Sequence, residues 1–493
     1  MRVPGWIVAT SVVAWACAGG ACASTGSGLA YVASDGGDDA SGDGGDGLGP
    51  AIYVSTTGSD LAMGTSPSDA VQTIGNGITL ATSCLGGPCV VKIAEGHYAE
   101  ALKLVGGVSL YGGYSTDFSM RDAANHAVIV ESSNFEPTVV ASGLLSATTV
   151  DGVTVQGPDL TTADGGQVSV ALSIASSGTQ LVVSNATVVG GTGAQGAVGA
   201  TGPNNTCTAA GGQGGVATDC DSANGTGGLA GGDPINGGDG GAGGSNDCPS
   251  ACPLVGSEGV SDGTGGTAGG NGSPGAGGTP ATDTVGSFAT GSWVGSTGGP
   301  GASGTNGTGG GGGGSGGTKK IAACFGCGTL LGGQGAAGAP GGCSGTGGAG
   351  GGAGGASIAV LVEDSQPTFQ TVTVVGGHGG VGGAGGLGGS GSPGGMTLDA
   401  GPGPAVTQTC GAISYSSGAG GAGGNGGNGG PGGGGAGGNG GPSIAVATLG
   451  GVGSLGQYTI QQGTGGLGGA GGSGPGLAGM SGIAGSVLGL QAF

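Results

Sequence analysis

Arg121 is the only arginine beyond the N-terminal segment, and the acidic residues Asp117, Asp122 and Glu131 lie near it in the sequence. A basic residue that accepts a proton, beside carboxylates that hold Ca²⁺, suits a polysaccharide lyase, whereas two or three carboxylates facing one groove suit a glycoside hydrolase. We therefore take Arg121, Asp122 and Glu131 as weak catalytic candidates. Asp151 precedes a glycine, where aspartate ordinarily stabilises a turn, so we predict a structural role for it.

Other chemical motifs lack the context that they need. The Cys324-x-x-Cys327 pair has no second Cys pair and no nearby histidine for zinc, and no βαβ pattern for redox chemistry. In Gly317-Thr318-Lys319-Lys320 the lysine does not follow a glycine directly, as a P-loop requires. The histidines are isolated from one another. We predict no metal site and no cofactor. We favour a non-enzymatic protein over an enzyme.

Composition narrows the classes of partner. The 493 residues include 143 glycines and carry a net charge of -21. This charge repels nucleic acid phosphates and anionic lipid surfaces, so we predict no nucleic acid partner. The glycine content means that much of the length cannot bury apolar side chains.

The N-terminal region resembles an export signal. Residues 1–22 contain one charge and an apolar run too short to span a bilayer, and small residues precede Cys22 as in a loose lipobox. We predict lipidation at Cys22, with plain cleavage after an Ala-x-Ala site as the alternative. Residues 23–50 are an acidic Gly/Asp/Ser tether. The protein is expected to be an outer-membrane lipoprotein on the cell surface, or secreted, and to contact membrane only through the lipid anchor.

The number of cysteines agrees with export to an oxidising compartment. Removing Cys17 with the signal and Cys22 as the lipidated residue leaves ten of the 12 cysteines, an even number. We predict disulfides, and pair neighbours in the sequence first and the remainder by elimination. The candidate pairs are Cys84 with Cys89, Cys207 with Cys220, Cys248 with Cys252, Cys324 with Cys327, and Cys343 with Cys410.

A strand block occurs three times, at 169–191, 357–377 and 443–463. Its apolar residues alternate with period two, which indicates strands, and repetition of one short unit indicates an all-β solenoid. Aligning the copies predicts an inward column of Leu110, Val155, Val188, Val374 and Ile460. The outward neighbours form a hydroxyl column of Ser109, Thr154, Thr187, Thr373 and Thr459.

A capping helix is expected before the first full coil. Ser66, Pro67 and Asp69 give the pattern of a helix start, and Val71, Ile74 and Ile78 fall on one helical face. Such a helix would cover the open end of a solenoid. Strands are predicted at 51–55, 90–94, 102–105 and 108–112.

The region 51–191 resembles the right-handed parallel β-helix proteins of the pectin-lyase-like superfamily, among them exported Gly-rich bacterial members. The resemblance rests on Ile52-Tyr53-Val54-Ser55, Glu95-Gly96-His97-Tyr98 and Val108-Ser109-Leu110-Tyr111-Gly112-Gly113-Tyr114. It implies N-terminal β-helix coils at 51–191 and, less strongly, single coils at 357–377 and 443–463. It implies fold more than activity, because this superfamily contains polysaccharide lyases and hydrolases but also adhesins.

Gly-rich insertions separate these coils, at 192–356 and 378–442, and a Gly-rich segment follows at 464–493. Two residues in three are glycine in runs such as Gly376-Gly377-His378, which differs from collagen. These runs resemble polyglycine II, a left-handed helix with three residues per turn whose bare glycine edges can pack and hydrogen-bond. The alternative is disorder, because ordering glycine costs about 1 to 2 kcal/mol per residue or more.

Together these features predict a cell-surface structural or adhesive protein that displays Gly-rich arms on a β-helix. The alternatives are a polysaccharide-active enzyme or a glycan-binding module on the same scaffold. Expected partners are extracellular glycan or cell-surface components.

Overall fold

The computed structural model describes residues 48–84, 88–133, 135–161, 165–205, 208–209, 211–218, 240–247, 260–289, 292–323, 326–397, 402–410, 413–450 and 452–493. The predicted signal segment, the lipidation site at Cys22 and nearly all of the predicted tether lie outside this part. Among the described residues, no helix has both the length and the apolar character to cross a membrane.

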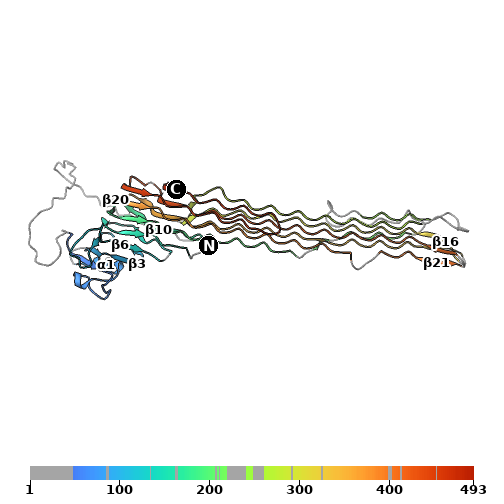
Figure 1. Ribbon diagram of the computed structural model, residues 1–493, viewed down its shortest axis with the longest axis horizontal. Coiled ribbons are helices and arrows are strands. Elements are labelled where there is room, and N and C mark those ends of the chain that lie inside the picture. Colours follow the sequence, from blue (N-terminus) through green and yellow to red (C-terminus); the bar gives the residue numbers. More distant parts are fainter. Residues whose placement is uncertain are drawn as a thin grey trace, which may run out of the picture. The chain divides into compact units, whose positions relative to one another are not determined.

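Parallel strands stack into a coil (Figure 1), and their pairing places them on three faces that the chain visits in turn. The first face contains β1 (Ala51–Val54), β2 (Val90–Ala94), β5 (Leu110–Tyr114), β8 (Thr148–Asp151) and β11 (Leu181–Ser184). The second contains β3 (Gly96–Ala99), β6 (Val128–Glu131), β9 (Thr154–Gln156) and β12 (Thr187–Val189). Strands β20 (Thr368–Val375) and β24 (Gly456–Gln461) extend over both faces.

The third face is a six-stranded parallel sheet. It contains β4 (Leu102–Lys103), β7 (Val139–Ser142), β10 (Ser169–Gly178), β19 (Ser357–Ser365), β23 (Ser443–Leu449) and β25 (Val487–Ala492). The nearly all-β chain with parallel sheets is consistent with a β-helix. Strand β25 lies in the predicted Gly-rich segment 464–493, where no strand was predicted.

The predicted inward column is confirmed from Val155 onward. Val155, Val188, Val374 and Ile460 occupy successive rungs in register. Side chains from all three faces meet in one core, as the alternation along each strand requires. The outward threonines Thr154, Thr187, Thr373 and Thr459 are likewise in register.

The predicted positions of two residues in these columns, Leu110 and Ser109, were wrong. Leu110 pairs with Val150 on the first face, and the Ser109 hydroxyl accepts a hydrogen bond from the Thr149 backbone N–H at 3.0 Å. The error arose because each early coil contributes separate strands to the first and second faces. A similar apolar-Gly ending therefore occurs at two different corners.

The capping helix is present, but it begins later than predicted. Pro67–Asp69 forms only a 3-10 turn (η1), and α1 spans Ile74–Ala81 with Thr73 as its N-cap. Val71 cannot join the helix because it forms a parallel bridge with Val54. Ile74 and Ile78 are buried against the core as predicted.

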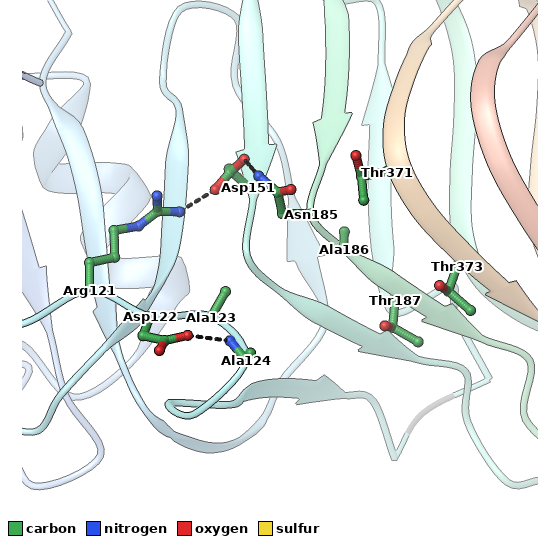
Figure 2. Close-up of a pocket in the computed structure, with 10 residues that line it drawn as sticks. All are labelled: Arg121, Asp122, Ala123, Ala124, Asp151, Asn185, Ala186, Thr187, Thr371 and Thr373. Atoms are coloured by element: carbon green, nitrogen blue, oxygen red, sulfur yellow. Dashed lines mark hydrogen bonds and ion pairs between the residues drawn. The ribbon is translucent and has the colours of Figure 1, made fainter.

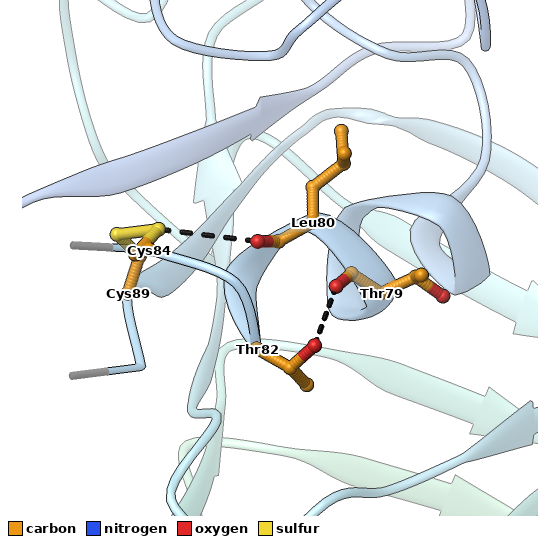
Figure 3. The surroundings of a disulfide bond; sticks show 5 residues. All are labelled: Thr79, Leu80, Thr82, Cys84 and Cys89. Atoms are coloured by element: carbon orange, nitrogen blue, oxygen red, sulfur yellow. Dashed lines mark hydrogen bonds between the residues drawn. A yellow bond between two sulfur atoms is a disulfide. The ribbon is translucent and has the colours of Figure 1, made fainter.

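The predicted Cys84–Cys89 disulfide is present beside the end of α1 (Figure 3). It closes a short loop between the helix and β2, and Cys89 is buried in the core. The covalent link therefore joins the capping helix to the first full coil.

Replacing both Cys84 and Cys89 by serine is expected to lower the free energy of unfolding by about 2 kcal/mol, since a loop of this length loses little entropy on closure. Urea unfolding measures the change. The single variant Cys84→Ser breaks the same bond and should lose a similar amount. Equal stability of the oxidised parent and the double variant would contradict the assignment.

Each Gly-rich insertion leaves and rejoins the coil at the same corner. Thr192, His378 and Thr464 form consecutive parallel bridges where the chain departs from the second face. Where it returns to the third face, a buried serine begins each strand, and its hydroxyl donates to a carbonyl of the departing chain of a neighbouring rung. These bonds are Ser169 to Pro158, Ser357 to Gly191 and Ser443 to Gly377, at 2.6 to 2.8 Å.

The inserted segments run side by side (Figure 1), and backbone hydrogen bonds join them at every third residue. Gly379, Gly382 and Gly385 donate to Thr464, Leu467 and Ala470 in a parallel pair, at 2.8 to 2.9 Å. Antiparallel pairs have the same period, as in the bonds from Gly380 to Gly355 and from Gly383 to Gly352, both 2.8 Å. The spacing of three residues means that each segment presents one row of donors to one neighbour.

Segment 418–441 is the central one. Its backbone exchanges hydrogen bonds with segments 260–281, 296–317, 332–355, 378–397, 464–473 and 476–486. Residues 432–441 are buried, whereas Asn425 and Asn428, which come earlier in the segment, are exposed. The burial explains the composition, since a side chain on most of these positions would overlap a neighbouring carbonyl group.

Polar side chains at the outer positions accept hydrogen bonds from backbone N–H groups. The Asn271 amide oxygen accepts from the Asn428 N–H at 2.8 Å, and the Thr308 hydroxyl accepts from the Gly270 N–H at 2.8 Å. Asn439 is the buried case: its amide donates to the carbonyls of Ala281 and Asp283, at 2.9 and 2.6 Å, so it ties the central segment to 260–289. The third residue of the triplets thus satisfies donors at the rim.

Short antiparallel hairpins end or interrupt the inserted segments. They are β14 (Ser287–Ala289) with β15 (Ser292–Val294), β16 (Lys319–Ala323) with β17 (Gly326–Leu330), and β21 (Thr407–Cys410) with β22 (Ile413–Ser416); β13 (Thr208–Ala209) pairs with β18 (Gly341–Gly342). Phe288 and Trp293 pack on Ile358 and Ile444, which face outward from the third face. The β14–β15 hairpin therefore fastens the longest insertion to the coil.

Candidate functional site

Two of the three catalytic candidates lie in one pocket, near the corner between the first and second faces (Figure 2). Arg121 and Asp122 line this cavity of about 470 Å³, which is open to solvent. Glu131 does not line it. Its carboxylate pairs with the His97 imidazole at 3.0 Å, on β6 and β3 of the second face.

Arg121 is held by the loop that follows β5. It forms an antiparallel bridge with Tyr114, and its Nε donates to the Gly112 carbonyl at 2.9 Å. Its guanidinium lies over the rings of Tyr111 and Tyr114, 5.5 and 5.6 Å from the ring centroids. A terminal nitrogen forms an ion pair with Asp151 (Figure 2). The arginine is thus held by several contacts, although its side chain remains 29 % exposed.

Asp151, at the end of β8, is the centre of the site. Its carboxylate accepts from Arg121, from the Ser184 hydroxyl, and from the Asn185 amide at 2.9 Å. Its side chain is only 10 % exposed. The prediction of a structural role agrees with these contacts, but no sequence pattern indicated the partners. Ser184 and Asn185 lie one coil further along the chain, and only the register of β8 with β11 reveals the contact.

Asp122 and Asp117 stabilise the loop that carries Arg121. The Asn125 amide and the Ala124 N–H donate to Asp122, at 2.7 and 3.0 Å, and these bonds lower the pKa of Asp122. Hydrogen bonds from Ser115 and Ser119 lower the pKa of Asp117 to about 2. Both carboxyl groups therefore stay ionised at neutral pH, which suits a hydrogen-bond acceptor and opposes general-acid chemistry.

Threonines form the other wall of the pocket. Thr187, Thr371 and Thr373 line it together with Asn185. Thr187 and Thr373 belong to the predicted hydroxyl column, but their position beside Arg121 was not predicted from the sequence. Asn185 and Thr371 have positive φ angles of 47° and 56° at the corner, a conformation that is costly for a β-branched residue.

A second carboxylate cluster lies at the start of α1. Glu100 accepts from the N–H groups of Ile74 and Gly75, at 2.7 and 2.9 Å, and Asp60 accepts from those of Gln72 and Thr73, both at 2.9 Å. Burial raises the pKa of Glu100 and outweighs these bonds. At Asp60 burial acts in the same direction, but the hydrogen bonds prevail and its pKa is lowered. Both groups anchor the capping helix.

These pKa shifts predict a stability maximum in weak acid. For Glu100, whose pKa is raised above 4.5 in the folded state, protonation favours folding, so stability rises as the pH falls toward 4.5. For Asp60, Asp117 and Asp122 the folded pKa lies below 3.8, so their contribution is present above pH 3.8 and is lost as the pH falls toward about 2. Urea midpoints at pH 7, 4.5 and 2.5 measure the curve. A steady rise down to pH 2.5 would contradict it.

Of the other disulfide candidates, only one has a described side chain. Cys343 is disulfide-bonded, and its partner is outside the described side chains. The pairing with Cys410 therefore stays a prediction. So do the pairings of Cys207, Cys220, Cys248, Cys252, Cys324 and Cys327, whose side chains are likewise not described. Within the described residues, no cluster of three or more His, Cys, Asp or Glu side chains is placed to hold a metal ion.

Comparison with known proteins gives structural neighbours only. No family model and no curated protein matches the chain. Pectin methylesterase PemA from Erwinia chrysanthemi is similar at 17 % identity and a TM-score of 0.20. Pectin methylesterase structures with hexasaccharide IV (a mutant) and hexasaccharide VII are similar at 19 % and 18 %, each with a TM-score of 0.20. In each case the match covers 29 % of this chain and 46 % of the other. At this TM-score the likeness supports no conclusion about activity, and the fold rests on the strand pairing described above.

Proposed function

We propose that this chain is a non-enzymatic structural or adhesive protein of the cell surface. A parallel β-helix displays an ordered bundle of Gly-rich segments toward extracellular glycan or cell-surface components. The chain is exported, and either a lipid at Cys22 or secretion without an anchor places it outside the cell. The bundle is the functional part, and the coil is its base.

The observation that carries the proposal is the environment of segment 418–441. Its residues exchange backbone bonds with neighbours on several sides at a period of three, and 432–441 are buried. This pattern supports a polyglycine II bundle, in which the three-residue turn aligns glycine edges for close packing. Backbone hydrogen bonds at each contact offset the entropy that glycine loses on ordering.

The state of the pocket also supports a non-enzymatic role. The Asp151 carboxylate accepts hydrogen bonds from Arg121, Ser184 and Asn185. The Asp122 carboxylate accepts a hydrogen bond from its own loop. The pKa of Asp122 is lowered, whereas a general acid at neutral pH needs a raised pKa. A polysaccharide-active enzyme remains the second candidate, because an arginine and two carboxylates converge on a solvent-open cavity.

The two candidates are separated by one paired experiment. Antibodies against the β21–β22 hairpin are applied to intact producing cells, and the purified protein is incubated with acidic polysaccharides and Ca²⁺. Surface labelling without unsaturated or newly reducing product is expected. Product that disappears in Arg121→Ala would instead establish the enzyme, and labelling only after lysis would contradict surface display.

A further inference from the structure

The two ends of the coil differ in how their strand edges are covered. At the first end, α1 packs on the core, and the outer edge of β1 bonds to segment 64–71. The Tyr53 N–H donates to the Gly64 carbonyl at 2.8 Å, and the Ser55 N–H donates to the Val71 carbonyl at 2.9 Å. These bonds cover the outer edge of the first face at this end.

The last coil has one edge of each strand open. Among the described residues, β24 pairs with β20 alone and β25 with β23 alone. In β24 and β25, side chains that are in register with fully buried residues of the preceding coil are exposed. Ile460 is 36 % exposed and follows Val374 at 0 %, and Leu490 is 56 % exposed and follows Val446 at 0 %. Core positions of the repeat therefore lack a covering rung.

The Gly-rich edge of the same layer is open as well. Gly379, Gly382 and Gly385 donate to segment 464–473. The equivalent N–H groups in the last layer belong to Gly465, Gly468 and Gly471, and no described residue accepts from them. Strand β24, segment 464–473 and strand β25 thus each present an edge of unused backbone groups, and we name these three together the terminal layer.

We propose that a second copy of this chain docks on the terminal layer across a twofold axis at β25, so that the open edges of β25 in the two copies pair antiparallel and Leu490 meets its counterpart. Strand β25 is six residues long and carries the exposed Leu490, so a second copy both pairs the edge and covers this side chain. A twofold contact closes on itself and gives a dimer.

Charge favours the same occupant. The chain has a net charge of -21, yet residues 400–493 contain no Asp, Glu, Lys, Arg or His. Two copies can therefore approach through the terminal layer without bringing like charges into contact. The acidic segment 23–50 has the wrong character to cover an uncharged apolar layer.

Sedimentation equilibrium of the full chain over a range of micromolar concentrations tests the proposal. A concentration-dependent mass of two copies is expected, and Leu490→Lys should weaken association at least tenfold. Leu145→Lys, at a position that is 92 % exposed far along the coil from β25, is the matched control and should change nothing. Circular dichroism checks that both variants are folded, and Leu490→Cys should cross-link between copies through a short bismaleimide.

Several results would overturn the proposal. They are a single-copy mass at every concentration, masses that grow without limit, equal weakening by Leu145→Lys, or absence of the Leu490→Cys cross-link in the associated species. Association that appears only after removal of residues 1–47 would show that the N-terminal segment occupies the terminal layer instead.

Discussion

Replacing Gly435 by alanine is expected to lower the free energy of unfolding by about 2 to 3 kcal/mol, because the added methyl group has no space. A Cβ on Gly435 would lie 2.0 Å from the carbonyl oxygen of Ala349, in the adjacent segment. The obstruction is backbone and cannot rotate away. Gly435 also donates to Gly386 at 2.9 Å and accepts from Gly472 at 2.7 Å, so a shift would break bonds to other segments.

Gly270→Ala is the matched control in the same bundle. The nearest atom to a Cβ there is the Thr308 hydroxyl oxygen at 3.8 Å, an ordinary contact. Alanine should leave stability unchanged or raise it by about 0.5 kcal/mol through the unfolded chain. Urea unfolding followed by circular dichroism compares the two variants. Equal effects would mean that the Gly-rich segments do not pack as described.

Replacing Asp151 by alanine is expected to cost about 3 kcal/mol, because it leaves the partly buried Arg121 guanidinium without its counter-charge. The Ser184 hydroxyl and the Asn185 amide lose an acceptor at the same time. Adding Arg121→Met to this variant should recover part of the loss, since the unpaired charge is then removed. The non-additivity in the double-mutant cycle measures the coupling of the pair.

The control for this site is Asp122→Ala. That carboxylate lines the same pocket but lies at the surface and serves its own loop. Its removal should have a clearly smaller effect than Asp151→Ala. If the two single variants were equally destabilised, Asp151 would not be the structural centre of the corner.

The parts of the fold that follow local patterns were predictable from the sequence. Alternation in the three repeated blocks predicts β10, β19 and β23 and places Val188, Val374 and Ile460 in one column. Strand β25 was missed because Gly489 interrupts its alternation and its neighbours are glycine-rich. The helix start was misplaced because Val71 fits a helical face in the sequence but forms a β-bridge with Val54 in the structure.

Contacts between distant parts of the chain were not predictable. The triplets indicate a three-residue repeat, but glycine edges are chemically identical and carry no information on which segments meet. Their order is set by the coil corners, where Thr192, His378 and Thr464 stack. The site followed the same rule: Arg121 and Asp122 were found from residue type, whereas Asp151 became its centre only through the register of β8 and β11.

Hydrogen exchange of the glycine amides tests the ordered packing of the Gly-rich bundle most directly. Amides of 432–441 bond to several surrounding segments and are buried, so they should exchange slowly, on the timescale of the core strands β19 and β23. Full exchange of these amides within seconds, beside protected strands, would contradict the ordered bundle.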